Sequence, residues 1–117
     1  MPSPIKNLIK IEDGYKFKGV GGLVVRLVHP DVCGSDKLGM GVVYVYPGEE
    51  LPDHKHSNEE AYFIISGTAI IRVGDEEFVV EKNMAVYIPA ETVHYTKNIG
   101  SEPLVFVCAL SPPPTAK

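Results

Sequence analysis

The sequence predicts an all-β protein built from antiparallel strands. From Leu23 onward, short runs rich in β-branched and aromatic residues follow one another, and turn residues separate them about every ten residues. No window of helix length shows a convincing 3.6-residue hydrophobic period. So many short strands in a small domain must close into a sandwich or a barrel to remove their open edges. The strand pattern alone does not distinguish these two forms.

Length and composition indicate one ordinary globular domain. A chain of 117 residues can bury a single core, and its hydrophobic share of 44% and charged share of 22% are typical of soluble proteins. The formal net charge of −4 provides no basic face, so we expect no nucleic-acid partner.

The apolar runs are only a few residues long, which predicts no membrane span. The first residues lack the apolar core of a signal peptide. Cys33 and Cys108 are too far apart in sequence to suggest a disulfide framework, and two free thiols favour a cytoplasmic protein.

Residues 1–22 are expected to form a short irregular N-terminal arm. Ile5, Leu8 and Ile9 have helical spacing, but the run is short, so either a single helical turn or an arm packed along a sheet is expected. The β domain is predicted over 23–110. Proline keeps the tail, 111–117, out of the sheet.

Glycine and proline pairs punctuate the β domain and set the strand limits. The segment 29–37 is expected to be a loop, and a short glycine-containing turn at 74–76 predicts a hairpin. The expected strands are 23–28, 41–46, 61–65, 69–73, 77–80, 85–88, 94–98 and 104–110.

Candidate ligands for a metal ion gather in the stretch GEELPDHKHSNEEAYFIISG, residues 48–67. His54 and His56 are separated by one residue, so on an extended strand both imidazoles point to the same face. A turn at 57–59 would fold Glu60 back toward them. Two imidazoles and a carboxylate suit a divalent transition metal, and His94 is a fourth candidate in a second segment.

These spacings resemble the two signature motifs of the cupin superfamily. The first motif is matched at every position by Gly48, His54, His56, Glu60 and Gly67. The second is matched in part by Pro89, His94 and Asn98.

Asn83 and Glu91 stand where the family usually has glycine. Asn83 tolerates a positive φ, so the turn there can survive, whereas we expect the chain to avoid a positive φ at Glu91.

The resemblance implies a jelly-roll-like antiparallel β-barrel, also called a double-stranded β-helix, with its site inside. Of the four histidines only His29 lies off the motifs. A shell of three imidazoles and one carboxylate leaves one or two open positions on a six-coordinate ion. It would fit iron, manganese, nickel or cobalt, with zinc possible, and an open position permits Lewis-acid chemistry or oxygen binding.

Strand alternation predicts which side chains surround the ligands. Tyr62 shares the face of Glu60 and is the candidate catalytic residue, as a proton donor or substrate anchor; equally, it could fill the barrel with its hydroxyl satisfied elsewhere. Lys55 should point outward, and Asn98 is expected to hold a turn.

Arg26 and Arg72 are the only arginines. One of them facing inward would favour an anionic substrate, and the sequence does not choose between them.

The expected function is that of a metal-dependent enzyme acting on a small polar molecule. The resemblance implies dioxygenase, isomerase, decarboxylase or lyase chemistry, and thus an oxidoreductase or an isomerase among the possible classes. The alternative is a non-catalytic module that binds or senses a small molecule with the same barrel. The apolar arm also predicts a homodimer with twofold symmetry.

Overall fold

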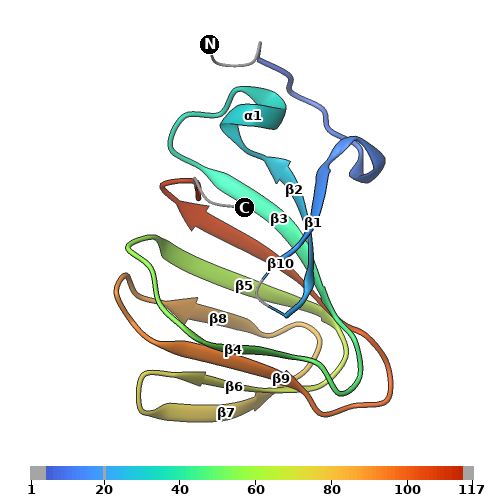
Figure 1. Ribbon diagram of the computed structural model, residues 1–117, viewed down its shortest axis with the longest axis vertical. Coiled ribbons are helices and arrows are strands. Elements are labelled where there is room, and N and C mark those ends of the chain that lie inside the picture. The colour runs from blue at the N-terminus through green and yellow to red at the C-terminus, as the bar shows by residue number, and fades with distance from the viewer. Residues whose placement is uncertain (1–4, 20, 115–117) are drawn as a thin grey trace.

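The structure is a computed structural model that describes residues 5–19 and 21–114 (Figure 1). Ten strands in these ranges form two antiparallel sheets that face each other in a jelly-roll-like barrel, which confirms the predicted fold class. The six-stranded sheet has the order β1-β2-β3-β10-β5-β8, and the four-stranded sheet has the order β4-β9-β6-β7. The strands are β1 (Tyr15–Lys18), β2 (Leu23–Val28), β3 (Gly39–Val45), β4 (Glu50–His54), β5 (Glu59–Ser66), β6 (Ala69–Val73), β7 (Glu76–Val80), β8 (Ala85–Ile88), β9 (His94–Asn98) and β10 (Leu104–Ser111).

Residues 1–4 of the predicted arm and 115–117 of the predicted tail lie outside the described residues. The rest of the arm is more regular than expected. It holds a 3-10 turn, η1 (Ile11–Asp13), and then β1, which pairs with β2 along its whole length. The expectation of irregular structure is therefore wrong over 15–18, because Tyr15 and Phe17 alternate with lysines as a strand requires.

A short helix, α1 (Pro30–Cys33), replaces part of the loop predicted at 29–37. The ring of His29 accepts a hydrogen bond from the Asp31 N–H at the helix start, and Pro30 occupies the first turn. Gly34 ends the helix with a φ of 77°. None of the helices in the described ranges is long and apolar enough to cross a membrane.

Four strands, β2, β6, β8 and β9, have the limits that the sequence predicts. β4 is an additional strand at the edge of its sheet, where Pro52 removes no required ladder hydrogen bond. Among the described residues, two that are not glycine have positive φ values, 70° at Asn83 as expected and 59° at Glu91. The expectation for Glu91 is thus wrong: its N–H donates to the His56 carbonyl at 2.8 Å, which offsets the cost of this conformation.

Inward-facing residues of the same strands form both the closed apolar core and the candidate site. Along β5, Ile64 is fully buried in the core, Tyr62 follows, and Glu60 lies at the site end. Asn98 holds the turn after β9, as predicted, because its amide donates to the carbonyls of Val45 and Glu102. Besides Ile64, the fully buried apolar residues of the closed core include Val45, Ile71, Ile88, Leu104 and Phe106.

Candidate metal centre

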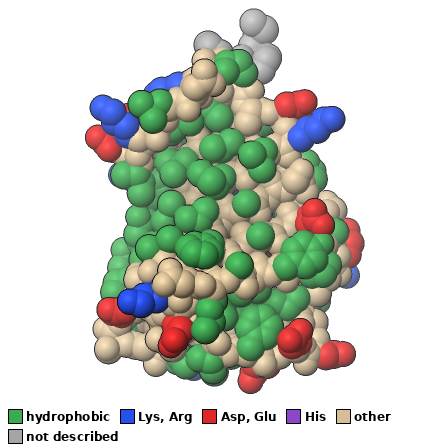
Figure 2. Space-filling view, turned by 180° about the vertical axis from the view of Figure 1, so that it is seen from behind, with side chains coloured by type: hydrophobic (Ala, Val, Ile, Leu, Met, Phe, Trp, Pro, Cys, Tyr) green, Lys and Arg blue, Asp and Glu red, His purple; other side chains and the backbone are tan. Residues whose placement is uncertain are grey.

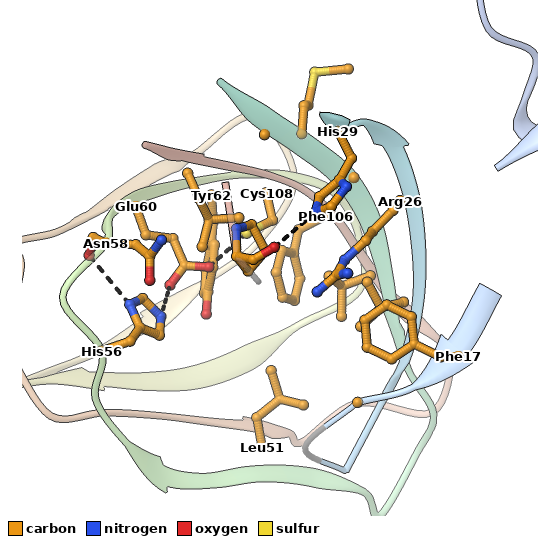
Figure 3. Close-up of a pocket in the computed structure, with 18 of the residues that line it drawn as sticks. Phe17, Arg26, His29, Leu51, His56, Asn58, Glu60, Tyr62, Phe106 and Cys108 are labelled. Carbon is orange, nitrogen blue, oxygen red and sulfur yellow. Dashed lines mark hydrogen bonds and ion pairs between the residues drawn. The ribbon is translucent and has the colours of Figure 1, made fainter. Parts of the chain in front are cut away.

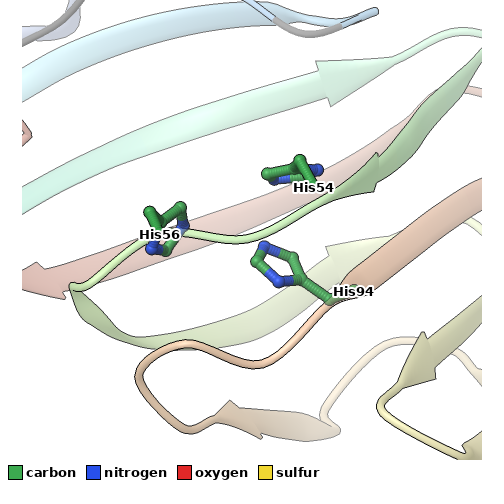
Figure 4. Close-up of side chains that lie close together, drawn as sticks. All are labelled: His54, His56 and His94. Atoms are coloured by element: carbon green, nitrogen blue, oxygen red, sulfur yellow. The ribbon is translucent and has the colours of Figure 1, made fainter.

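Three histidines meet where β4 pairs with β9 (Figure 4). His54 ends β4 and is the cross-strand partner of His94, which begins β9, while His56 follows β4 in the next loop. The His54 and His94 ring centroids lie 4.1 Å apart, and the His56 centroid lies 5.1 Å from that of His94. One ring nitrogen from each histidine lies within 4.8 Å of the others. The structure therefore brings the three predicted imidazoles together.

The backbone orients all three rings in the same way. Each Nδ1 faces a backbone carbonyl two residues away, at 2.7 Å for His54, 3.3 Å for His56 and 2.9 Å for His94. A carbonyl oxygen can only accept, so Nδ1 of each ring is the nitrogen that carries the hydrogen. In the neutral ring with this tautomer, Nε2 presents a lone pair, which is the form that ligates a metal. The contact of His56 Nε2 with Glu60 Oε1 at 3.1 Å is a hydrogen bond only when that ring is protonated.

Glu60 places a carboxylate oxygen among these lone pairs. Its Oε1 lies 3.1 Å from Nε2 of His56 and 3.3 Å from Nε2 of His94. The His94 nitrogen is buried and, within the described residues, no hydrogen bond of adequate geometry satisfies it. Neutral imidazole lone pairs and a carboxylate that converge in this way repel one another unless a cation lies between them. This donor set fits a divalent metal ion.

The pKa shifts describe the same electrostatic environment. Burial pushes the pKa of Glu60 up, but its contacts with His94 and Cys108 and the positive charges that His94 and His56 carry when protonated outweigh burial and bring that pKa below its usual value. Burial lowers the pKa of His54, whereas the contact of His94 with Glu60 outweighs burial and raises the pKa of His94. An ionised carboxylate and a neutral His54 are thereby favoured at neutral pH.

Cys108 contacts the candidate ligand Glu60 from the side opposite the histidines, a contact that sequence reasoning missed. Both cysteines are free, as predicted, and both are buried. The Cys108 thiol donates to Oε2 of Glu60 at 2.6 Å, while burial and the charge of Glu60 raise its pKa and keep it protonated. The alternation of Leu104, Phe106 and Cys108 along β10 indicates that the thiol points inward. Its contact with Glu60, however, depends on the register in which β10 pairs with β5.

A cavity of about 600 Å³ opens beside the histidines and Glu60 (Figure 3). The tail borders this cavity, because the ring of His29 donates from Nε2 to the Pro114 carbonyl at 2.7 Å. Most of its wall is apolar: Phe17, Val24, Val28, Met40, Val43, Leu51, Phe106 and Leu110.

Tyr62 lies inside the barrel on the face of Glu60, as the strand alternation predicts. Its ring packs against Phe106 with centroids 4.2 Å apart, and its hydroxyl lies close to Thr96. Burial and the nearby Glu60 raise the pKa of Tyr62 well above its usual value, so the phenol stays protonated and can donate a hydrogen. Its part in catalysis stays a prediction.

The structure also distinguishes the two arginines. Arg26 lines the cavity and is buried. Arg72 lies outside it, in an ion pair with Asp53 and with its guanidinium over the ring of Tyr95. Lys55 is exposed, as predicted.

Comparisons with known proteins agree with this fold. The sequence profile of the Cupin domain matches residues 41–110. A 94-residue stretch is 34% identical to an uncharacterized protein of Methanocaldococcus jannaschii, covering 80% of this chain and 75% of that protein. Auxin-binding protein 1 of Arabidopsis thaliana is 31% identical, over 75% of this chain and 52% of its own length.

Among solved structures, a mutant of Bacillus subtilis oxalate decarboxylase superposes with a TM-score of 0.78 at 27% identity. The match covers 91% of this chain but 30% of the decarboxylase. This chain therefore spans about half of the plant relative and less than a third of the bacterial enzyme.

Proposed function

The chain belongs to the cupin domain family, and on that basis we propose that it is a metal-dependent enzyme acting on a small molecule. Its metal ligands in this proposal are His54, His56, Glu60 and His94. The observation that carries the proposal is the convergence of three Nε2 lone pairs and one carboxylate oxygen at the wall of an open cavity. An iron, manganese, nickel or cobalt ion, or zinc, would supply Lewis acidity there and, if redox-active, electron transfer.

The surrounding residues would orient a substrate and hold its protons. A substrate that fills the cavity would displace water from its apolar walls, which would strengthen electrostatic interactions within it. The protonated hydroxyl of Tyr62 is a proton donor that the strand holds on the same face as Glu60. Dioxygenase, isomerase, decarboxylase and lyase reactions all remain compatible with such a site, and the decarboxylase name of the Bacillus subtilis enzyme supports the catalytic class.

A non-catalytic binding module is the second candidate. Two observations favour it: the cavity is lined mainly by apolar side chains, and one relative is named as an auxin-binding protein. Native mass spectrometry of the metal-loaded protein after incubation with a small-molecule extract distinguishes the two classes. A ligand that stays bound and unaltered for hours indicates the binding module, whereas its conversion to products indicates the enzyme.

The metal assignment is tested by measuring metal content after purification and reloading. The double variant His56→Ala, His94→Ala should lose most of its metal because two of four ligands are removed, while its far-ultraviolet circular dichroism should stay that of a β protein. The control is Lys55→Ala, which changes the exposed residue between the two histidines and should keep the metal of the wild type. Stoichiometric metal in the double variant would show that the ligands lie elsewhere.

We also propose that two copies associate with twofold symmetry. In the arm, Ile5 and Leu8 are 71% and 77% exposed. A second apolar surface lies on the outer face of the six-stranded sheet, where Phe63 on β5 neighbours Ala85 on β8 and Val107 on β10. Hydrophobic side chains gather over the middle of the molecule in the view from behind (Figure 2). A sheet face of this kind can pack against its own copy about a twofold axis.

A further inference from the structure

A buried arginine faces the cavity from the wall opposite the metal ligands. Arg26 lies in the middle of β2 and is 7% exposed. In Figure 3 its guanidinium points into the cavity from one side, while His56 and Glu60 lie on the other. The guanidinium carbon is 4.7 Å from the centroid of the Phe17 ring, which holds the head group in place by a cation–π contact.

The pairing of β2 with β3 places Arg26 on the face of the sheet that lines the cavity. The cross-strand partner of Arg26 is Gly41, which also lines the cavity. A Cβ at Gly41 would lie 2.6 Å from the Val25 carbonyl oxygen, so the close approach of the two strands requires glycine there. Because Gly41 has no side chain, the inner wall beside Arg26 stays open to the cavity.

Arg26 keeps its charge in this setting. Burial lowers its pKa, and the negative charge of Asp31 opposes that effect. A guanidinium nevertheless stays protonated at neutral pH. A buried positive charge that borders a cavity makes that region favourable for an anion, and the planar fork of arginine matches a carboxylate with two parallel hydrogen bonds.

Apolar wall separates Arg26 from the metal ligands in this cavity. Leu51 and Phe106 line it between Arg26 on one side and Glu60 on the other (Figure 3). Lys18 also lines the cavity, but it forms an ion pair with Glu49 at 3.6 Å. Cavities of about 300–1,000 Å³ hold ligands of drug-like size, so about 600 Å³ admits an aromatic or aliphatic body of one or two rings.

We propose that Arg26 binds the carboxylate of a substrate whose apolar body fills the cavity and whose other end reaches the metal. One guanidinium supplies one positive charge and one bidentate pair of donors, which suits a monocarboxylate better than a phosphate dianion. The part of this inference that concerns the metal rests on the proposed function. The anion site on Arg26 does not, since the residues that form it hold no metal.

The test compares matched carboxylates and neutral amides of increasing length. The pairs are benzoate and benzamide, phenylacetate and phenylacetamide, and 3-phenylpropanoate and 3-phenylpropanamide. Isothermal titration calorimetry measures their binding to metal-free and to manganese-loaded protein. In at least one pair the carboxylate should bind the metal-free wild type about tenfold or more tightly than the amide, the scale expected of a hydrogen-bonded ion pair.

Variants then assign that preference to Arg26. Arg26→Gln should reduce it to about twofold or less while its metal content stays that of the wild type. Arg26→Lys keeps the charge but not the planar fork and should retain only part of the preference. Arg72→Gln, which changes the arginine outside the cavity, should retain all of it.

Three outcomes would overturn the inference: no carboxylate preference in any pair, an undiminished preference in Arg26→Gln, or a preference seen only with manganese bound. The last would place the carboxylate on the metal. If Arg26→Gln fails to fold, Arg26→Lys decides, because an unchanged preference in that variant contradicts bidentate recognition. A protein that binds no metal yet loses its carboxylate preference in Arg26→Gln would refute the proposed function and leave this inference intact.

Discussion

Cys108 should control metal affinity although it is not itself a proposed ligand. Its thiol donates to Oε2 of Glu60 at 2.6 Å, while Oε1 of the same carboxylate faces His56 and His94. Cys108→Ala removes the thiol that donates this hydrogen bond, so the carboxylate of Glu60 is no longer held in one orientation. The pKa of Glu60 should then rise, since the hydrogen bond from Cys108 is one of the causes that lower it.

The expected loss is about 10- to 100-fold in metal affinity. Hydrogen bonds to charged groups contribute about 1.5–3 kcal/mol, and a change of that size in the free energy of metal binding corresponds to about 10- to 100-fold in affinity. In other metal sites, loss of a hydrogen bond to a metal ligand lowers metal affinity by a similar factor. The free energy of unfolding of the metal-free protein should fall by about 1.5–3 kcal/mol, because the same hydrogen bond is lost, while the thiol itself is small and borders a cavity that is already open.

The assay is a titration of manganese into metal-free protein in competition with a chelator. Cys33→Ala is the matched control, because both cysteines are 6% exposed and Cys33 lies in α1, apart from the ligands. Cys108→Ser should recover part of the affinity, since a hydroxyl is also a donor. Equal affinity in Cys108→Ala, Cys33→Ala and the wild type would refute the claim that the thiol orients Glu60.

The remaining predictions concern catalysis, acidity and assembly. Tyr62→Phe should lower turnover of the substrate by about 10²-fold or more if the hydroxyl transfers a proton, with little change in metal content. Tyr62→Ala should lower the free energy of unfolding by about 3–5 kcal/mol because the contact with Phe106 is lost, and full activity in the Phe variant would assign Tyr62 a packing role alone. Metal occupancy measured after dialysis should fall with falling pH, because imidazoles bind metal only when neutral and a free imidazole titrates at about 6.5. The raised pKa of His94 should make that loss begin at a higher pH than for a free imidazole, and occupancy that stays constant down to pH 5 would contradict histidine ligation. Light scattering at micromolar concentration should give the mass of a dimer, and a monomer mass would exclude the proposed association.

Local signals in the sequence were sufficient to predict most of the strands and the meeting of the histidines. Runs of β-branched and aromatic residues bounded by turn residues are signals with a range of a few residues, and β6 and β8 lie within such runs. The spacing of His54 and His56 is likewise local, so their common orientation could be read before any pairing was known. β1 is only four residues long, too short for its alternation to stand out.

Features that depend on register between strands could not be read in advance. The contact between Cys108 and Glu60 joins residues 48 positions apart on neighbouring strands. The inward direction of Arg26 depends on how β2 lies against β3, where the register shifts between Arg26 and Val28. The positive φ at Glu91 depends on the hydrogen bond to His56, which forms only after the two loops meet.

Anomalous diffraction from crystals of the manganese-loaded protein tests the central claim most directly. One peak is expected within about 2.0–2.4 Å of Nε2 of His54, His56 and His94 and of Oε1 of Glu60, with at least one further position open toward the cavity. Each Nδ1 should keep its hydrogen bond to the backbone carbonyl that it faces now. Manganese bound at any other group of residues, with these four side chains outside coordinating distance, would contradict the assignment.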